Sequence, residues 1–103
     1  SDMTQNCLLN LVVSPEVEDT VTDWMLAHAA VGGFSSHPIS GHGSSEHSMT
    51  LAEQVAGRRR QVLFQMHLSC AEAQTLLEGI KSDFHGSGMH YWMTRLIAGG
   101  HLE

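Results

Sequence analysis

The pattern of apolar and polar positions predicts four strands in this chain. Residues 7–13 form a short apolar run that ends in β-branched valines, which is typical of a buried strand. Over residues 61–68 apolar side chains alternate with a mixed set, which predicts a strand with one apolar face. Residues 34–40 and 89–97 are interpreted as two further strands, and Pro38 favours an edge position for the former.

Two further segments carry the amphipathic period of about 3.6 residues that indicates helices. The first follows Ser14 and Pro15, an N-cap and a first-turn proline, and ends at the glycines at 32–33. The second begins with a capping box, in which Ser69 is the N-cap and Glu72 lies three residues later. The apolar stripe of the second helix consists of Ala73, Leu76, Leu77, Ile80 and Phe84.

This order of elements predicts an α+β, ferredoxin-like βαββαβ fold with a four-stranded antiparallel sheet and both helices on one face. The length of 103 residues fits a single domain over 1–103, with a long connection at 44–60. The other face of the sheet is then uncovered, and we expect it to be an oligomer interface. Its predicted members are Leu8, Asn10, Val12, Leu63, Gln65 and His67.

Four short segments carry a resemblance to a known family. Residues 12–15 end the first strand as Val-Val-Ser-Pro, and residues 41–43 form a Gly-His-Gly turn. Residues 44–60 match a T-loop in position, and residues 85–88 read His-Gly-Ser-Gly before the last strand. In these features the chain resembles PII-type signalling proteins, and most closely the small PII-like proteins associated with heavy-metal efflux pumps.

The resemblance implies a homotrimer with clefts between subunits that bind small ligands, and Asn10, Gln65 and His67 would lie at the trimer interface. Two features depart from the family pattern. Residues 85–90 contain no Lys or Arg, whereas nucleotide-binding PII proteins carry basic residues there. The single tyrosine, Tyr91, lies on the last predicted strand and not in the T-loop.

The net charge of the chain limits the classes of partner that it can bind. Five Lys and Arg against eleven Asp and Glu give a formal net charge of −6, which argues against nucleic acid. No apolar run reaches the roughly 18–20 residues of a membrane span, so we expect no membrane insertion. The first residues lack the features of a signal peptide, and the expected location is cytoplasmic.

The chain has only two cysteines, Cys7 and Cys70. We therefore expect no disulfide-framed fold and interpret both as small buried residues.

Eight histidines make metal binding the first ligand hypothesis. The densest set of ligand-type side chains surrounds the long connection and consists of His37, His42, Glu46, His47 and Met49. Imidazole, carboxylate and thioether together suit Cu, Zn or Ni, although no C-x-x-C or H-E-x-x-H spacing fixes a geometry. A solvated loop with incidental histidines is the alternative.

An anion site is the second ligand hypothesis. Its candidate residues are the only basic run and the glycines near the two loops, namely Gly41, Gly43, Arg58, Arg59, Arg60, Gly86 and Gly88.

No nucleophile elbow, paired carboxylates or Walker loop is present, so we expect a non-enzymatic protein. The favoured function is a regulatory sensor in which a small ligand, a transition-metal ion, orders residues 44–60 and changes how they engage a partner. By family resemblance that partner is a membrane metal-efflux transporter. The alternatives are a sensor of an adenine nucleotide or other anionic metabolite in the inter-subunit cleft, and a ligand-free protein-interaction module.

Overall fold

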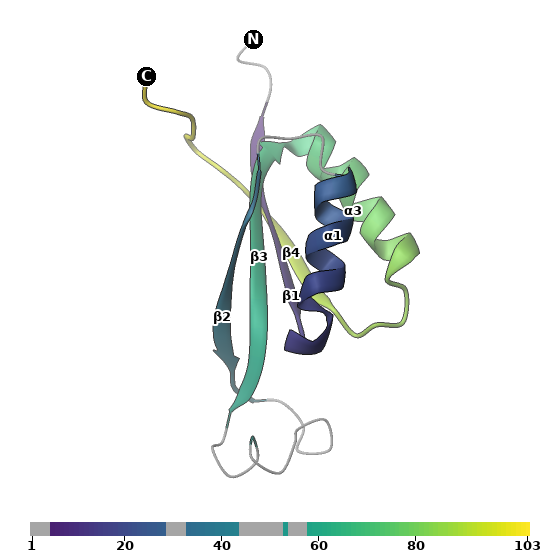
Figure 1. Ribbon diagram of the computed structural model, residues 1–103. Coiled ribbons are helices and arrows are strands. Elements are labelled where there is room, and N and C mark those ends of the chain that lie inside the picture. The colour runs from purple at the N-terminus through teal and green to yellow at the C-terminus, as the bar shows by residue number, and fades with distance from the viewer. Residues whose placement is uncertain (1–4, 29–32, 44–52, 54–57) are drawn as a thin grey trace.

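A computed structural model describes residues 5–28, 33–43, 53 and 58–103, which form one sheet with helices packed on it (Figure 1). The elements, in chain order, are β1 (Asn6–Val13), the 3₁₀ helix η1 (Pro15–Val17), α1 (Glu18–His28), β2 (Ser35–Gly41), β3 (Arg59–Ser69), α3 (Cys70–Asp83) and β4 (His90–Arg95). This is the order that the hydrophobic pattern predicts.

The four strands lie in the order β2-β3-β1-β4, and every neighbouring pair is antiparallel. Figure 1 shows α1 and α3 together on one face of the sheet. The predicted ferredoxin-like α+β fold is therefore confirmed. Pro38 lies on β2, an edge strand, as expected for a residue that cannot donate a ladder hydrogen bond.

The core fills the space between the helices and the sheet. Alternate residues of the two central strands face the helices, since neighbouring side chains of a strand point to opposite faces. On β1 and β3 these core residues are Cys7, Leu9, Leu11, Val13, Val62, Phe64, Met66 and Leu68. Val21 and Met25 of α1 and Ala73, Leu76, Leu77 and Ile80 of α3 complete the buried cluster. The predicted stripe of the second helix is thus the one that packs, with Phe84 half-buried at its end.

The predicted capping box begins α3. The Ser69 side-chain oxygen accepts a hydrogen bond from the backbone N–H of Glu72 at 3.1 Å, and Glu72 Oε1 accepts from the Ser69 N–H at 3.3 Å. At the other helix, Ser14 has the extended backbone of an N-cap, but its side chain makes no capping hydrogen bond. A 3₁₀ turn precedes α1 there.

Trp24 links the two helices. Its indole Nε1 donates a hydrogen bond to Asp83 Oδ2 at 2.7 Å, and its ring meets Phe84 edge-on with centroids 5.6 Å apart. Gly79 of α3 leaves room for this ring, because a Cβ there would lie 3.3 Å from Trp24. His28, which the sequence places at the core edge, is exposed, and its ring stacks on the Trp24 ring with centroids 4.0 Å apart.

The bounds of β2 and β3 differ from the predicted strands at 34–40 and 61–68. Gly41 pairs with Arg59 and Ser40 with Arg60, so these two arginines belong to β3 and not to the connection. The cause is the partner strand, because pairing with β2 extends β3 beyond its own apolar pattern. Figure 1 shows the β2–β3 hairpin reaching past the helices, and the molecule measures 51 × 26 × 21 Å. Among the described residues no helix is long and apolar enough to cross a membrane.

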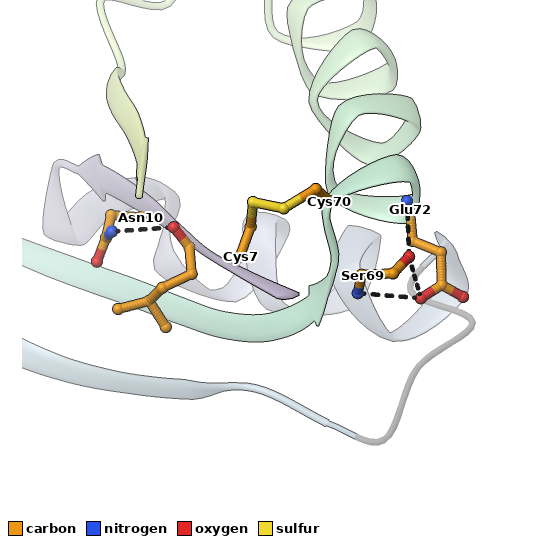
Figure 2. The surroundings of a disulfide bond; sticks show 6 residues. Cys7, Asn10, Ser69, Cys70 and Glu72 are labelled. Atoms are coloured by element: carbon orange, nitrogen blue, oxygen red, sulfur yellow. Dashed lines mark hydrogen bonds between the residues drawn. A yellow bond between two sulfur atoms is a disulfide. The ribbon is translucent and has the colours of Figure 1, made fainter. Parts of the chain in front are cut away.

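The two cysteines correct another expectation. Cys7 and Cys70, interpreted from the sequence as separate buried residues, form a disulfide with Cα atoms 4.9 Å apart (Figure 2). Cys7 pairs with Leu68 across the β1–β3 ladder, and the chain enters α3 two residues later. Strand pairing therefore brings together sulfurs that are 63 residues apart in the sequence.

Candidate ligand-binding site

The glycine-rich turn after α3 is built on two left-handed residues. Gly86 and Gly88 have φ of +78° and +80°, a region that L side chains rarely adopt. Ser87 N–H donates to the Phe84 carbonyl at 3.1 Å, and Met89 N–H donates to Ser87 Oγ at 3.3 Å. Turns of this kind present backbone N–H groups together and form concave sites for anions.

A cavity of about 310 Å³ joins this turn to the arginine run. It is lined by Ser87 and Gly88 of the turn, by Arg59 and Gln61 of β3, and by residues 12–14 at and just after the end of β1. The structure therefore brings together two predicted ligand-binding positions, Arg59 and Gly88, that are 29 residues apart in the sequence.

The other two arginines, Arg60 of β3 and Arg58 directly before it, lie beside a different cavity. Arg58 and Arg60 line a separate cavity of about 490 Å³ with Pro38 and Glu18. Their side chains are separated from that of Arg59 because neighbouring side chains of an extended chain point to opposite faces. Glu53 holds the start of this segment, because its Oε2 accepts a hydrogen bond from the Arg60 N–H at 2.8 Å. The Arg58 N–H also donates to the Glu53 carbonyl at 3.2 Å.

Gly41, another predicted ligand-binding position, is the last residue of β2 and pairs with Arg59. A Cβ at this position would meet only the end of the flexible Gln61 side chain, which can move aside. Gly43, two residues later, has φ of +82° and needs glycine for its backbone conformation.

Lys81 is a cation that the sequence analysis missed beside the glycine-rich turn. It lines a cavity of about 300 Å³ with His85, Gly86 and Tyr91. Its ammonium nitrogen lies 5.3 Å from the centroid of the Tyr91 ring, within the range of a cation–π contact. The available signal was the position of Lys81 in the last turn of the helix that leads into the turn.

The predicted metal ligands are only partly within the described structure. His37 lies on β2 and His42 directly after it, and both are exposed. Five residues of extended chain separate them by about 16 Å, which is too far to share one ion within the strand. Glu46, His47 and Met49 lie outside the described residues. Within the described ranges, no three His, Cys, Asp or Glu residues are grouped as a metal site.

The sheet face opposite the helices carries the predicted interface residues. Asn10 is only 2% exposed, and its Oδ1 accepts a hydrogen bond from Gln65 Nε2 at 2.9 Å. Trp92 of β4 pairs with Asn10 on the other side and is 41% exposed. His67 is exposed at one end of this face, where Gly99 of the C-terminal segment approaches its ring. The face thus combines apolar side chains with a satisfied polar pair.

Several solved structures share this fold. A DUF3240 family protein from Shewanella baltica superposes with a TM-score of 0.74 and 20% identity, over 95% of this chain and 97% of that one. CPII from Thiomonas intermedia, a nitrogen regulatory PII-like protein bound to ADP, AMP and bicarbonate, gives a TM-score of 0.68 and 17% identity over 95% and 97%. CutA from Synechococcus elongatus gives 0.68 and 15% over 91% and 79%. The fold is therefore PII-like, as the resemblance implied.

Sequence comparison identifies the family of the chain. No curated protein matches the chain. The family described as "Protein of unknown function (DUF3240)" matches residues 3–103, almost the whole chain. The protein is therefore a member of the DUF3240 family.

Proposed function

We propose that this protein is a non-enzymatic regulatory protein that binds a small anionic ligand, such as an adenine nucleotide, in the cavity between Arg59 and Gly88. The cavity that these two residues share is the observation that carries the proposal. A guanidinium forms strong charge-assisted hydrogen bonds with phosphate or carboxylate oxygens, and Ser87 and Gly88 of the glycine-rich turn line the same cavity as Arg59.

The position of the cavity supports a regulatory role. Arg59 is the first residue of β3 and therefore directly follows the connection from β2. A ligand held by Arg59 would bias the conformation of that connection, provided that it binds one arrangement better than the other. The connection would then present a different surface to a partner protein. CPII, which shares the fold, was solved with ADP, AMP and bicarbonate, which are all anions.

The uncovered sheet face supports a homotrimer as the assembled form. Leu8 and Leu63, both half-buried, lie there beside the already buried Val12 and the hydrogen-bonded pair of Asn10 and Gln65. Burying Leu8 and Leu63 against two further copies would remove them from water, and the paired amides would not be left unsatisfied. His67 would then lie within the interface. Cavities near subunit boundaries would gain walls from neighbouring copies.

Titration calorimetry with AMP, ADP, ATP and bicarbonate tests the proposal. We expect the Arg59→Ala variant to bind the preferred ligand about 10- to 100-fold more weakly, because a charge-assisted hydrogen bond contributes about 1.5–3 kcal/mol. The matched control is Arg95→Ala, which removes the same side chain near the opposite end of β1, where Arg95 pairs with Cys7. Equal loss in both variants, or no binding of any anion, would reject the anion site.

A transition-metal ion is the second candidate ligand. The exposed His42 favours it, because this residue directly follows β2 and precedes the segment that contains Glu46, His47 and Met49. Titrating the same protein with Cu, Zn and Ni ions tests this candidate. Metal binding unaffected by His42→Ala combined with His47→Ala would exclude a metal site at these histidines. If the protein binds a transition-metal ion, a metal-efflux transporter is the proposed partner. If it binds neither an anion nor a metal ion, a ligand-free protein-interaction module is the remaining candidate.

A further inference from the structure

Sulfur atoms gather at the end of the core farthest from the ligand cavity. Cys7 is 5% exposed on the helix-facing side of β1, and Cys70, the first residue of α3, is half-buried. Their Cα atoms are 4.9 Å apart (Figure 2). Once reduced, the two thiols would remain neighbours, because strand pairing and the capped start of α3 hold both backbones without the disulfide.

Two methionines lie on the same side of the sheet beside this pair. Leu9 pairs with Met66 on β3 and with Met93 on β4, and Cys7 lies two residues before Leu9 on the same face. Both methionines are therefore diagonal neighbours of Cys7, at about 7–8 Å between backbones, which a methionine side chain can span. Met66 is buried in the core cluster, and Met93 packs against that cluster.

We infer that the reduced Cys7–Cys70 pair is a site for one soft monovalent metal ion, such as Cu(I), with two thiolate ligands and a thioether from Met66 or Met93. Thiolate and thioether are the ligands that Cu(I) prefers. Zinc prefers four nitrogen, sulfur or oxygen ligands, and the described residues hold no cluster of three His, Cys, Asp or Glu that would supply them.

Local charge suits such a complex. Two thiolates and one monovalent cation leave a net charge of −1, which the start of a helix stabilises. Cys70 is the first residue of α3, and Arg95 pairs directly opposite Cys7 across the β1–β4 ladder. The partly exposed Cys70 provides the entry side for the ion, because Cys7 itself is almost fully buried.

Metal binding and the disulfide exclude each other. A dithiol reductant transfers two electrons and two protons to the disulfide: the Cys7–Cys70 bond breaks, both sulfurs become thiols, and the reductant closes its own disulfide. The metal ion then displaces the two thiol protons. After removal of the metal, exchange with an external disulfide restores the Cys7–Cys70 bond, and that disulfide takes up the two electrons and two protons and is reduced to two thiols. The site is therefore available only to the reduced protein.

Competition with a chromophoric Cu(I) chelator under anaerobic conditions tests the site on the full chain. After reduction and removal of reductant, we expect one Cu(I) per chain to be held with sulfur-only coordination by X-ray absorption. The oxidised protein, identical in sequence, is the matched control and is expected to bind at least 100-fold more weakly. Any Cu(I) that histidines take up will register in this oxidised sample.

Variants separate coordination from folding. Cys70→Ser, at the partly exposed position, should bind at least 100-fold more weakly while keeping the circular dichroism of the reduced wild type. Met66→Leu and Met93→Leu conserve volume, and at least one should weaken binding several-fold. Reduced wild type that competes no better than Cys70→Ser or the oxidised protein would overturn the site. Binding unchanged in the Met66→Leu/Met93→Leu double variant would overturn the thioether ligand.

Discussion

At the scale of single residues, the Cys7–Cys70 disulfide is the strongest local constraint in the molecule. It joins positions 63 residues apart and crosses from β1 to the start of α3. A covalent bond of this kind restricts the unfolded chain more than the folded one. For a loop of this length, the lost chain entropy corresponds to about 4 kcal/mol of stability at room temperature.

Reduction of this bond is therefore expected to lower the free energy of unfolding by about 4 kcal/mol. Urea unfolding, followed by tryptophan fluorescence with and without excess dithiothreitol, measures the change. The Cys7→Ser/Cys70→Ser double variant is the control, since its unfolding midpoint should not respond to the reductant. Coincident midpoints for the reduced and oxidised wild type would contradict the expected contribution.

At the scale of elements, the contact between α1 and α3 depends on one aromatic side chain. Trp24 donates its indole N–H to Asp83, meets the ring of Phe84 and fits over Gly79. The short α1 buries only Val21 and Met25, so this contact supplies much of what fixes its position. Loss of the Trp24–Asp83 hydrogen bond should therefore be measurable in the stability of the whole fold.

Trp24→Phe keeps an aromatic ring but removes the N–H donor, and we expect a loss of about 1 kcal/mol from the hydrogen bond. A double-mutant cycle with Asp83→Ala isolates this part from the packing change. The coupling between the two substitutions, measured by urea unfolding, should also be about 1 kcal/mol. Purely additive effects would mean that the hydrogen bond contributes nothing to stability.

The elements themselves were largely predictable because each carries a local signal. β1 has its apolar run, β3 its alternation, and α3 begins with a Ser69–Glu72 capping box that can be read directly from the sequence. The start of β3 at Arg59 carries no such signal, since three consecutive arginines do not alternate and only pairing with β2 extends the strand. A strand boundary set by a partner is not encoded locally.

The candidate site was predictable in part for the same reason. Arg59 and Gly88 could be proposed separately as anion contacts, but only the folded sheet places them around one cavity. Lys81 was not predicted, because only the folded structure shows that its side chain lines the cavity beside the glycine-rich turn. The disulfide was missed because Cys7 and Cys70 meet only through the β1–β3 register.

At the scale of the whole molecule, one side of the sheet lacks a second layer among the described elements. The helices bury the other side, while Leu63, Val12 and Leu8 lie on the face that they leave open. With extents of 51 × 26 × 21 Å, the chain is elongated, which raises its ratio of surface to core. Self-association through the open face would lower this ratio, because it would bury part of the surface.

Leu63→Glu is expected to convert the proposed trimer into monomers, because three carboxylates would be buried around the interface without partners. Light scattering after size-exclusion chromatography measures the mass directly. Leu26→Glu is the matched control, since Leu26 is 69% exposed on α1 and lies on a helix outside the open face. A wild-type protein that is already monomeric at micromolar concentration would reject the trimer.

The disulfide also changes what a cut in the backbone would do. Because Cys7 and Cys70 close a covalent ring that includes β1, α1, β2 and β3, any single peptide bond broken inside the ring leaves two fragments in one molecule. The connection at 44–58 lies within that ring, between β2 and β3. A protease that cleaves there produces a nicked protein of undiminished mass, and the fragments separate only after reduction.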